Sequence, residues 1–439
     1  MRVLYVNHTS EVSGAEHSLL SLLAGLPDTV QPLLATPRGS LMEAAKRLGV
    51  PTTAIAGTAG SLRLHPLHTP RALAEMAIAA AQVRRAANRH EAEVVHANSI
   101  RAGIVVGLAR PPAASIAHIR DCLPPGAVST ATLRLIAATA TTMVANSRHT
   151  AQSVSAAAPY ARLEVVHNPV DLERWDAARL DRAEARARLG AAGERTLLLG
   201  VIAQLSPWKG QDTAIEALRL VSEQGIDAQL LLIGSAKFRA RATRFDNEGY
   251  VARLRAQVAE AGLQDRVSWL GEREDVPELL SALDILLLPS WEEPFGRALI
   301  EAMALDVAVI ATNVGGPPEI LHDGREGLLA PPRQPHAWAQ AIGELAQSPE
   351  RRREMGRAGR RRVEQAFTAG HHVAAICEVY ERAVARRSGE GPSPRQAARR
   401  VDDLQASPTK AALGYVNDDG EGSPDALCVQ LSRAAGSSG

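Results

Sequence analysis

The segment ILLLPSWEEPFGRALIEAMALDVAVIAT, from Ile285 to Thr312, contains two short apolar runs with a helical pattern between them. The runs ILLL and VAVIA are almost continuous in Leu, Ile, Val and Ala, which is typical of parallel strands buried on both faces. Pro294 suits the first turn of the intervening helix, where its missing N–H costs nothing. A strand, a crossover helix and a second strand form the repeating unit of a parallel α/β sheet.

The same alternation extends over most of the 439 residues. In the first half, the runs predicted to be strands are Arg2–Val6, Pro32–Thr36, Glu93–Ala97, Ser115–Ile119, Thr142–Asn146 and Leu163–His167. In the second half, they are Thr196–Ala203, Ala228–Gly234, Arg266–Gly271, Ile285–Ser290 and Val307–Thr312. We therefore predict an α/β protein with two Rossmann-like parallel sheets. Ligands of such sheets bind at the carboxyl ends of the strands, so the active site is expected in an interdomain cleft.

The domain boundaries follow from a charged, strand-free segment between the two series, Asp171–Glu194. The predicted units are an N-terminal Rossmann-like domain (1–172), a linker (173–195), a C-terminal Rossmann-like domain (196–366), a helix crossing back to the N-terminal domain (367–387) and a disordered tail (388–439). The tail is rich in Gly, Pro, Ser and Asp and has little periodicity, so it offers few apolar groups to bury.

The composition narrows the function classes. A net charge of +1 and 3% aromatic residues disfavour nucleic-acid binding. The three cysteines, Cys122, Cys377 and Cys428, lack disulfide-framework or zinc-ligand spacing, so a reducing cytoplasm is expected. No apolar run approaches the roughly 18 residues of a membrane span, which leaves only peripheral membrane contact. The sequence does not indicate an oligomeric state.

Two carboxylates stand on either side of the predicted helix start, Glu293 just before it and Glu301 inside it. If the helix begins at Pro294, Glu301 lies about 10 Å further along the axis, at ~1.5 Å per residue. That distance is similar to the length of a diphosphate. Gly296 allows close approach to the backbone, and the free N–H groups of a helix start bind anions. The alternative is a capping Glu293 and an exposed Glu301 on an ordinary helix.

Five separated motifs, in this order, resemble those of glycosyltransferase family 4, retaining enzymes of the GT-B fold. They are SEVSGAEHSLLSLL, AHIRD, the pair ANSRHTAQ and VVHNPVD, GVIAQLSPWKGQD, and EEPFGRALIEAMA followed by VGGPPEIL and DGREGLLAPP. The last of these matches the E-x7-E motif of the family through Glu293 and Glu301. The resemblance extends from Met1 to about Arg387.

The resemblance implies that the C-terminal domain binds a nucleotide sugar. Lys209 matches the second of two cations that face the donor diphosphate, whereas Gln204 stands where the family usually has the first, an arginine. Gln204 is still assigned to donor binding. Its presence implies either that Arg273 or Arg297 shares the stabilisation of the leaving group or that the donor differs. Glu293 would bind sugar hydroxyls and Glu301 the ribose diol. The expected phosphate-binding segment consists of Phe295, Gly296, Arg297 and Ala298.

The resemblance also implies that the N-terminal domain binds the acceptor. Gly14, in a loop with Ser13 in place of the usual second glycine, would approach donor phosphate, with Glu16 opening the helix. His118 would lie near the transferred sugar as a catalytic residue, together with Lys209 and Glu293. Acceptor contacts are expected from three loops: Ser10–Gly14, Leu62–His68 and His118–Pro125.

The predicted function is retaining transfer of a sugar, typically a hexose, from a UDP- or GDP-sugar to an acceptor hydroxyl, without a metal or other cofactor. The acceptor classes considered are a lipid-linked or polysaccharide intermediate of the cell envelope, an inositol or aminocyclitol, and a secondary metabolite. The alternatives are a nucleotide-sugar 2-epimerase, a phosphorylase and a non-catalytic nucleotide-sugar-binding protein. A dehydrogenase is disfavoured because no complete G-x-G-x-x-G follows a strand.

Overall fold

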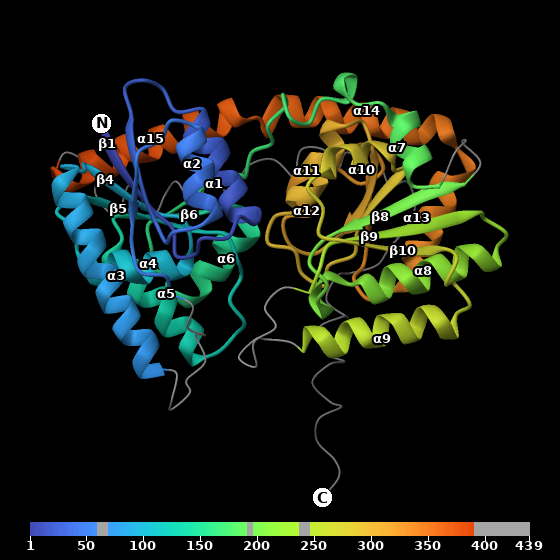
Figure 1. The fold of residues 1–439 in the computed structure, drawn as a ribbon, viewed down its shortest axis with the longest axis horizontal. Coiled ribbons are helices and arrows are strands. Elements are labelled where there is room, and N and C mark those ends of the chain that lie inside the picture. The colour runs from blue at the N-terminus through green and yellow to red at the C-terminus, as the bar shows by residue number, and fades with distance from the viewer. Residues whose placement is uncertain (59–68, 191–195, 237–245, 390–439) are drawn as a thin grey trace, which may run out of the picture. The chain divides into compact units, whose positions relative to one another are not determined.

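The computed structural model describes residues 1–58, 69–190, 196–236 and 246–389 (Figure 1). These residues form two parallel sheets, so the prediction of two Rossmann-like sheets is confirmed. The predicted tail lies outside the described residues after position 389, as does the predicted acceptor loop Leu62–His68. No helix in the described part of the chain is long and apolar enough to cross a membrane.

The N-terminal sheet has seven strands in the order β3-β2-β1-β4-β5-β6-β7. Its strands are β1 (Arg2–Val6), β2 (Gln31–Thr36), β3 (Thr52–Ala54), β4 (Val94–Ala97), β5 (Ala114–Ile119), β6 (Thr142–Ala145) and β7 (Leu163–Val165). Its helices are α1 (Gly14–Ala24), α2 (Ser40–Arg47), α3 (Thr69–Arg89), α4 (Ile100–Ala109), α5 (Ala127–Thr139) and α6 (Arg148–Ala157).

The C-terminal sheet has six strands in the order β10-β9-β8-β11-β12-β13. Its strands are β8 (Leu197–Ile202), β9 (Ala228–Ile233), β10 (Val267–Gly271), β11 (Ile285–Leu288), β12 (Ala308–Thr312) and β13 (Leu328–Ala330). Its helices are α8 (Gln211–Glu223), α9 (Asn247–Glu260), α10 (Val276–Ala282), α11 (Arg297–Ala304), α12 (Pro317–Ile320), α13 (Pro335–Gln347) and α14 (Pro349–Ala366). The linker contributes a 3-10 turn, Ala177–Arg179, and helix α7 (Arg182–Arg188).

Each sheet carries an apolar core on both faces, because successive side chains of a strand point to opposite sides. In β1, Leu4 and Val6 belong to one buried cluster, with residues of α3 to α6, whereas Val3 and Tyr5 belong to the other. In the C-terminal sheet, α8, α9 and α13 cover one face and α10, α11 and α14 the other (Figure 1).

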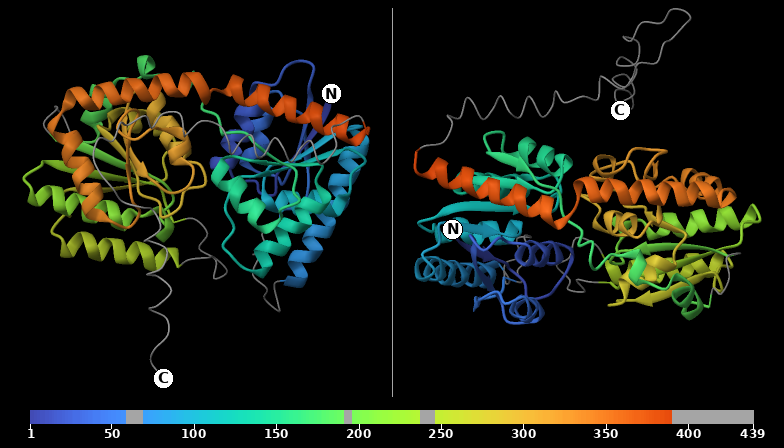
Figure 2. Two further views of the ribbon diagram at one scale, coloured as in Figure 1. Left: turned by 180° about the vertical axis from the view of Figure 1, so that it is seen from behind. Right: turned by 90° about the horizontal axis from the view of Figure 1, so that it is seen from above.

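The last described helix, α15 (Ala369–Arg387), packs on the N-terminal sheet although it follows the C-terminal one (Figure 2). Its residues Ile376, Val379, Tyr380 and Ala383 are in the same buried cluster as Val3 and Tyr5 of β1. Helix α14 ends just before it at Ala366, and the side chain of Thr368 caps α15 by accepting from the His371 N–H.

Candidate active site

The predicted site residues lie at the end of β5, where His118 is part of the strand, and in the segments that follow β1, β8 and β11. These segments leave the carboxyl ends of parallel strands, which is where open α/β sheets bind ligands. Contacts between the two halves of the chain join several of these segments.

Lys209 and Glu293 form an ion pair, with 2.7 Å between Lys209 Nζ and Glu293 Oε2. The two side chains are 13% and 9% exposed. Ser290 donates from Oγ to the same carboxylate oxygen at 2.8 Å, and the Lys209 ammonium lies 3.9 Å from the Trp208 ring centroid. The pair is therefore largely removed from water and held in place by groups from the β8 and β11 loops.

The backbone explains why Lys209 reaches this position. Gly210, with φ of +69°, follows Lys209, and a Cβ at Gly210 would lie 1.9 Å from the Pro289 carbonyl oxygen. Only glycine therefore permits the β8 loop to approach the β11 loop so closely. The Trp291 N–H donates to the Trp208 carbonyl at 2.9 Å and joins the same two loops.

The start of α11 corrects the spacing argument made from the sequence. The helix begins at Arg297, and the preceding Gly296 has φ of +107°, so Pro294 lies in the loop and not in the first helical turn. Glu301 is thus four residues inside the helix, or about 6 Å along the axis at ~1.5 Å per residue. The predicted separation of 10 Å along one helix is wrong. The first amides of α11, including Arg297 and Ala298, still have no helical acceptor.

Glu301 is 9% exposed, so it does not face bulk solvent as the alternative interpretation required. Arg297 Nη2 lies 2.6 Å from Glu301 Oε1, and Arg297 Nη1 donates to the carbonyl of Gly14 in the N-terminal domain. The guanidinium therefore joins the predicted ribose-binding carboxylate to the glycine loop after β1. Its buried Nε has no hydrogen-bond partner among the described residues.

Ser13, which replaces the usual second glycine, has a structural role. Ser13 and Glu16 form a capping box at the start of α1, in which the Ser13 N–H donates to Glu16 Oε2 at 3.1 Å. Asn7 donates from Nδ2 to the other oxygen at 3.1 Å, and Glu16 is 2% exposed. Glu16 is therefore fully engaged in holding the loop that presents Gly14.

His118, predicted to lie near the transferred sugar, is completely buried in this structure. Arg120 Nη2 lies 3.3 Å from His118 Nδ1, and a guanidinium can only donate, so Nδ1 accepts and the ring proton is on Nε2. His96 Nε2 is 3.3 Å from the same Nδ1, and Tyr380 of α15 contacts His96 Nδ1 at 2.6 Å. His118 Nε2 has no partner among the described residues.

The electrostatics of this network keep His118 neutral. Burial, with smaller contributions from Arg120 and His96, lowers its pKa well below the usual value. Arg120 is itself buried and also donates to Asn98 Oδ1 at 3.1 Å and to Asn168 Oδ1. Sequence reasoning missed Arg120 as a residue that orients His118, although it lies two residues away in the AHIRD motif.

Asp121, at the end of that motif, was also missed. Desolvation by the surrounding protein raises the pKa of its carboxyl. The positive charge of Lys209 lowers this pKa, and the negative charge of Glu293 raises it. Asp121 therefore lies close enough to Lys209 and Glu293 for their charges to affect its carboxyl. The acidic residue at the end of a strand was the available signal.

The two arginines proposed to compensate for Gln204 differ in position. Arg273 forms an exposed pair with Asp275, at 2.5 Å between Nη2 and Oδ2. Arg297 lies in the cluster with Gly14 and Glu301 described above. Gln204 is half-buried, and its carbonyl accepts from Gln211 Nε2 at 2.9 Å. Of the two arginines, Arg297 is the one the structure brings to the candidate site.

Contacts between the domains continue beside the Pro294–Phe295–Gly296 turn. Ser147, which caps α6, donates from Oγ to the Pro294 carbonyl at 2.6 Å. Glu319 of α12 accepts from the His149 N–H at 2.9 Å and from His167 Nε2 at 3.1 Å. The start of α6 is therefore anchored to the turn that precedes the predicted donor-binding segment.

Comparison with known proteins gives two family matches. The model described as Glycosyltransferase Family 4 matches residues 12–174, and that described as Glycosyl transferases group 1 matches residues 181–362. The chain is 30% identical over 275 residues to D-inositol 3-phosphate glycosyltransferase of Mycolicibacterium gilvum, which covers 58% of each chain. It is 29% identical over 226 residues to 2-deoxystreptamine glucosyltransferase of Streptomyces kanamyceticus, covering 51% of this chain and 55% of the relative.

Among solved structures, Anabaena HepE in complex with UDP-glucose superposes with a TM-score of 0.72 and 25% identity, covering 87% of this chain and 99% of that one. This likeness supports the expected two-domain α/β fold. Each of the two curated relatives is spanned over less than two thirds of its own length.

Proposed function

Because the chain belongs to the family 4 glycosyltransferases, we propose that it transfers a sugar from a nucleotide diphosphate sugar to an acceptor hydroxyl. The observation that carries this proposal is the largely buried Lys209–Glu293 pair at the carboxyl ends of β8 and β11. An ammonium paired with a carboxylate that shortly precedes a helix start is suited to binding a diphosphate together with the unpaired amides of that helix. The carboxylate beside it is suited to accepting hydrogen bonds from sugar hydroxyls.

A UDP-sugar is the proposed donor, because HepE structures contain UDP and UDP-glucose. The proposed acceptor is a cyclitol, one of the classes considered from the sequence. The names of the two curated relatives support it, since inositol phosphate and 2-deoxystreptamine are both polyhydroxylated six-membered rings.

The proposed mechanism is retaining and assigns no covalent nucleophile. Glu293 is paired with Lys209 and Glu301 with Arg297, so each carboxylate already has a cationic partner. The acceptor oxygen attacks the anomeric carbon on the face from which the diphosphate departs. The carbon–oxygen bond to phosphate breaks as the new bond forms, and the acceptor proton passes to the departing phosphate oxygen.

Electrostatic stabilisation of the departing diphosphate is the main catalytic contribution in this proposal. Lys209 exchanges part of its contact with Glu293 for phosphate, and the first amides of α11 contribute partial positive charge. Arg297 takes the role of the family arginine that Gln204 replaces. These cations would make the reaction independent of a metal. The neutral His118, with its proton on Nε2, is a hydrogen-bond donor for a hydroxyl or phosphate oxygen when the site is occupied.

The test is incubation of the purified protein with UDP-glucose and a panel of cyclitols, with products identified by mass spectrometry. We expect Lys209→Ala and Glu293→Ala each to lower transfer at least ~100-fold, as loss of a preorganised donor does in other enzymes. Arg273→Ala, which removes an exposed ion pair, is the matched control and should retain activity. Near-normal turnover in both site variants would contradict the proposal.

A second candidate is a non-catalytic nucleotide-sugar-binding protein, favoured by Gln204 at the usual arginine position. The same incubation separates the two. An enzyme gives transfer or slow hydrolysis of UDP-glucose, whereas a binding protein gives saturable binding in calorimetry without either product.

A further inference from the structure

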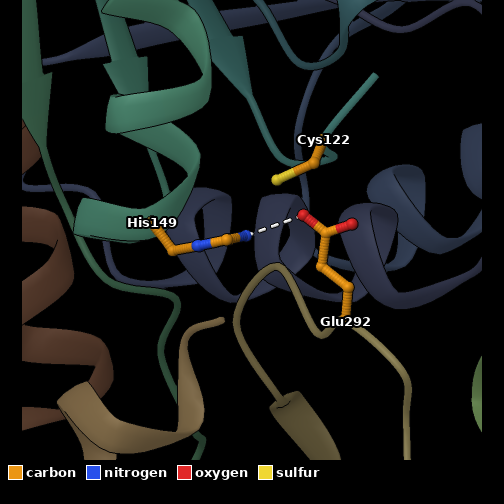
Figure 3. A group of neighbouring side chains, drawn as sticks. All are labelled: Cys122, His149 and Glu292. Carbon is orange, nitrogen blue, oxygen red and sulfur yellow. Dashed lines mark hydrogen bonds and ion pairs between the residues drawn. The ribbon is translucent and has the colours of Figure 1, made fainter. Parts of the chain in front are cut away.

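Three side chains of types that bind soft and borderline metal ions meet beside the candidate active site (Figure 3). Cys122 follows β5, His149 is in the first turn of α6, and Glu292 is in the loop after β11. The thiol sulfur, an imidazole nitrogen and a carboxylate oxygen all lie within 4.8 Å of one another. We propose that these three residues form a zinc site joining the two Rossmann-like domains, independent of the glycosyltransferase proposal.

The spacing is close to that of a metal site. With bond lengths of roughly 2.0–2.3 Å and tetrahedral angles, two ligand atoms of one zinc ion are about 3.4–3.6 Å apart. His149 Nε2 and Glu292 Oε1 are 2.8 Å apart, as a hydrogen-bonded pair. If a metal ion replaced the proton between His149 Nε2 and Glu292 Oε1, these two atoms would have to move apart by less than about 1 Å. That is roughly the difference between a hydrogen-bond length and the distance between two ligand atoms of one ion. The thiol sulfur, which lies within 4.8 Å of the other two ligand atoms, must approach them by up to about 1.3 Å.

The donor set selects the class of ion. A thiolate, an imidazole and a carboxylate suit Zn²⁺, whereas Mg²⁺ and Ca²⁺ prefer oxygen ligands alone. Three protein ligands leave the fourth position of a tetrahedral ion for water or another ligand. The ion has access from solvent, because the side chains of His149 and Glu292 are 26% and 48% exposed.

Neighbouring groups hold two of the ligands in place. The backbone N–H of His149 donates to Glu319 at 2.9 Å, which fixes the start of α6. Cys122 Sγ lies 3.8 Å from Oγ1 of Thr150, the residue after His149 in the first turn of that helix. Such outer contacts orient metal ligands and contribute to affinity. Because Glu292 precedes Glu293, a bound ion would cross-link the domains one residue away from the donor-binding carboxylate.

The simpler explanation is a His149–Glu292 hydrogen bond in which Cys122 has no part, and the sequence prediction was that no metal binds. Cobalt(II) separates the two, because it occupies zinc sites and its bond to a thiolate absorbs in the near ultraviolet. We expect metal-free full-length protein to bind one Co²⁺ per chain with this absorption, and one equivalent of Zn²⁺ to abolish it.

The variants identify the ligands. Cys122→Ser should remove the sulfur–cobalt absorption. His149→Gln and Glu292→Gln should each weaken Co²⁺ binding at least about tenfold, since even outer contacts of a metal site contribute 10–100-fold. Cys377→Ser and Cys428→Ser are the matched controls and should bind as the unmodified protein does.

Three results would overturn the proposal: no sulfur–cobalt absorption at all, an unchanged band in Cys122→Ser, or a band that depends on Cys377 or Cys428. Thermal unfolding of each variant without metal checks that the fold is intact. Glu292→Gln changes a half-exposed side chain, so its binding result is informative even if Cys122→Ser folds poorly.

Discussion

Replacing Lys209 by Met should destabilise the protein, and replacing Glu293 by Gln in the same chain should restore most of the loss. Removing one partner of a buried ion pair costs about 3–5 kcal/mol, because the other charge stays buried without its partner. Ser290 still donates to Glu293 in the single variant, and the two side chains keep 13% and 9% exposure. We therefore expect the lower end, about 3 kcal/mol. The double variant has no unpaired charge and should lie within about 1 kcal/mol of the unmodified protein.

Thermal unfolding at pH 7 measures the effect. A change of 1 kcal/mol shifts Tm by about 2–4 °C for a domain of 150–250 residues. Lys209→Met should therefore lower Tm by about 6–12 °C, and the double variant by less than about 4 °C. Transfer should remain at least ~100-fold slower in both variants, because the double substitution restores packing but not the diphosphate contact.

The control is to break the exposed Arg273–Asp275 pair in the same way. Exposed pairs contribute only about 0–1 kcal/mol to the free energy of unfolding, so Tm should change little. An unchanged Tm in Lys209→Met would show that solvent screens the Lys209–Glu293 pair. Restored transfer in the double variant would exclude both residues from donor binding.

Three further predictions concern other features. Gly210→Ala should destabilise the protein and slow transfer, because the new Cβ would clash with the Pro289 carbonyl. The control is Gly262→Ala, which is also at positive φ but has no atom within 4 Å of the new Cβ, so it should cost only the backbone strain of about 1–2 kcal/mol. Tm and the transfer rate are measured for both variants. Glu301→Gln should weaken UDP binding about tenfold in calorimetry if Glu301 holds the ribose, because a charge-assisted hydrogen bond contributes roughly 1.5–3 kcal/mol, and unchanged affinity would contradict that role. Burial, with a smaller contribution from a nearby arginine, lowers the pKa of His372 to about 3 in the folded protein. In the unfolded chain this pKa is about 6.5, so below that pH the unfolded chain binds a proton at His372 and the folded protein does not. This histidine should therefore lower the free energy of unfolding by about 1.4 kcal/mol for each unit by which the pH decreases. Urea unfolding between pH 7 and 5 should show a smaller dependence of that free energy on pH in His372→Gln. An unchanged dependence would contradict this assignment.

Much of the fold follows from the sequence because most strands are continuous apolar runs. The predicted Arg2–Val6 has the bounds of β1, and all six strand predictions of the first half coincide with strands of the structure. The strands that were not predicted, β3 (Thr52–Ala54) and β13 (Leu328–Ala330), have three residues each. Runs of that length are too short for a period to be recognised, and only pairing with a neighbouring strand identifies them.

The candidate site was less predictable because it depends on contacts between distant segments. The helix start at Arg297 is set by the positive φ of Gly296, which a proline-based pattern does not reveal. His118 contacts His96, which in turn contacts Tyr380, 262 positions away from His118 in the sequence. The grouping of Cys122 with ligands from two other loops likewise has no signature in sequence spacing.

The packing of α15 on the N-terminal sheet means that the N-terminal half of this protein is not encoded by one contiguous piece of its gene. A fragment ending at residue 172 would present the apolar side chains of Val3 and Tyr5 to water, because the helix that shields them is encoded about two hundred codons later. Any chimera that exchanges the nucleotide-binding half must therefore keep residues 369–387 matched to the first half. Evolution of new acceptor specificity in such chains is constrained in the same way, since the two ends must change together.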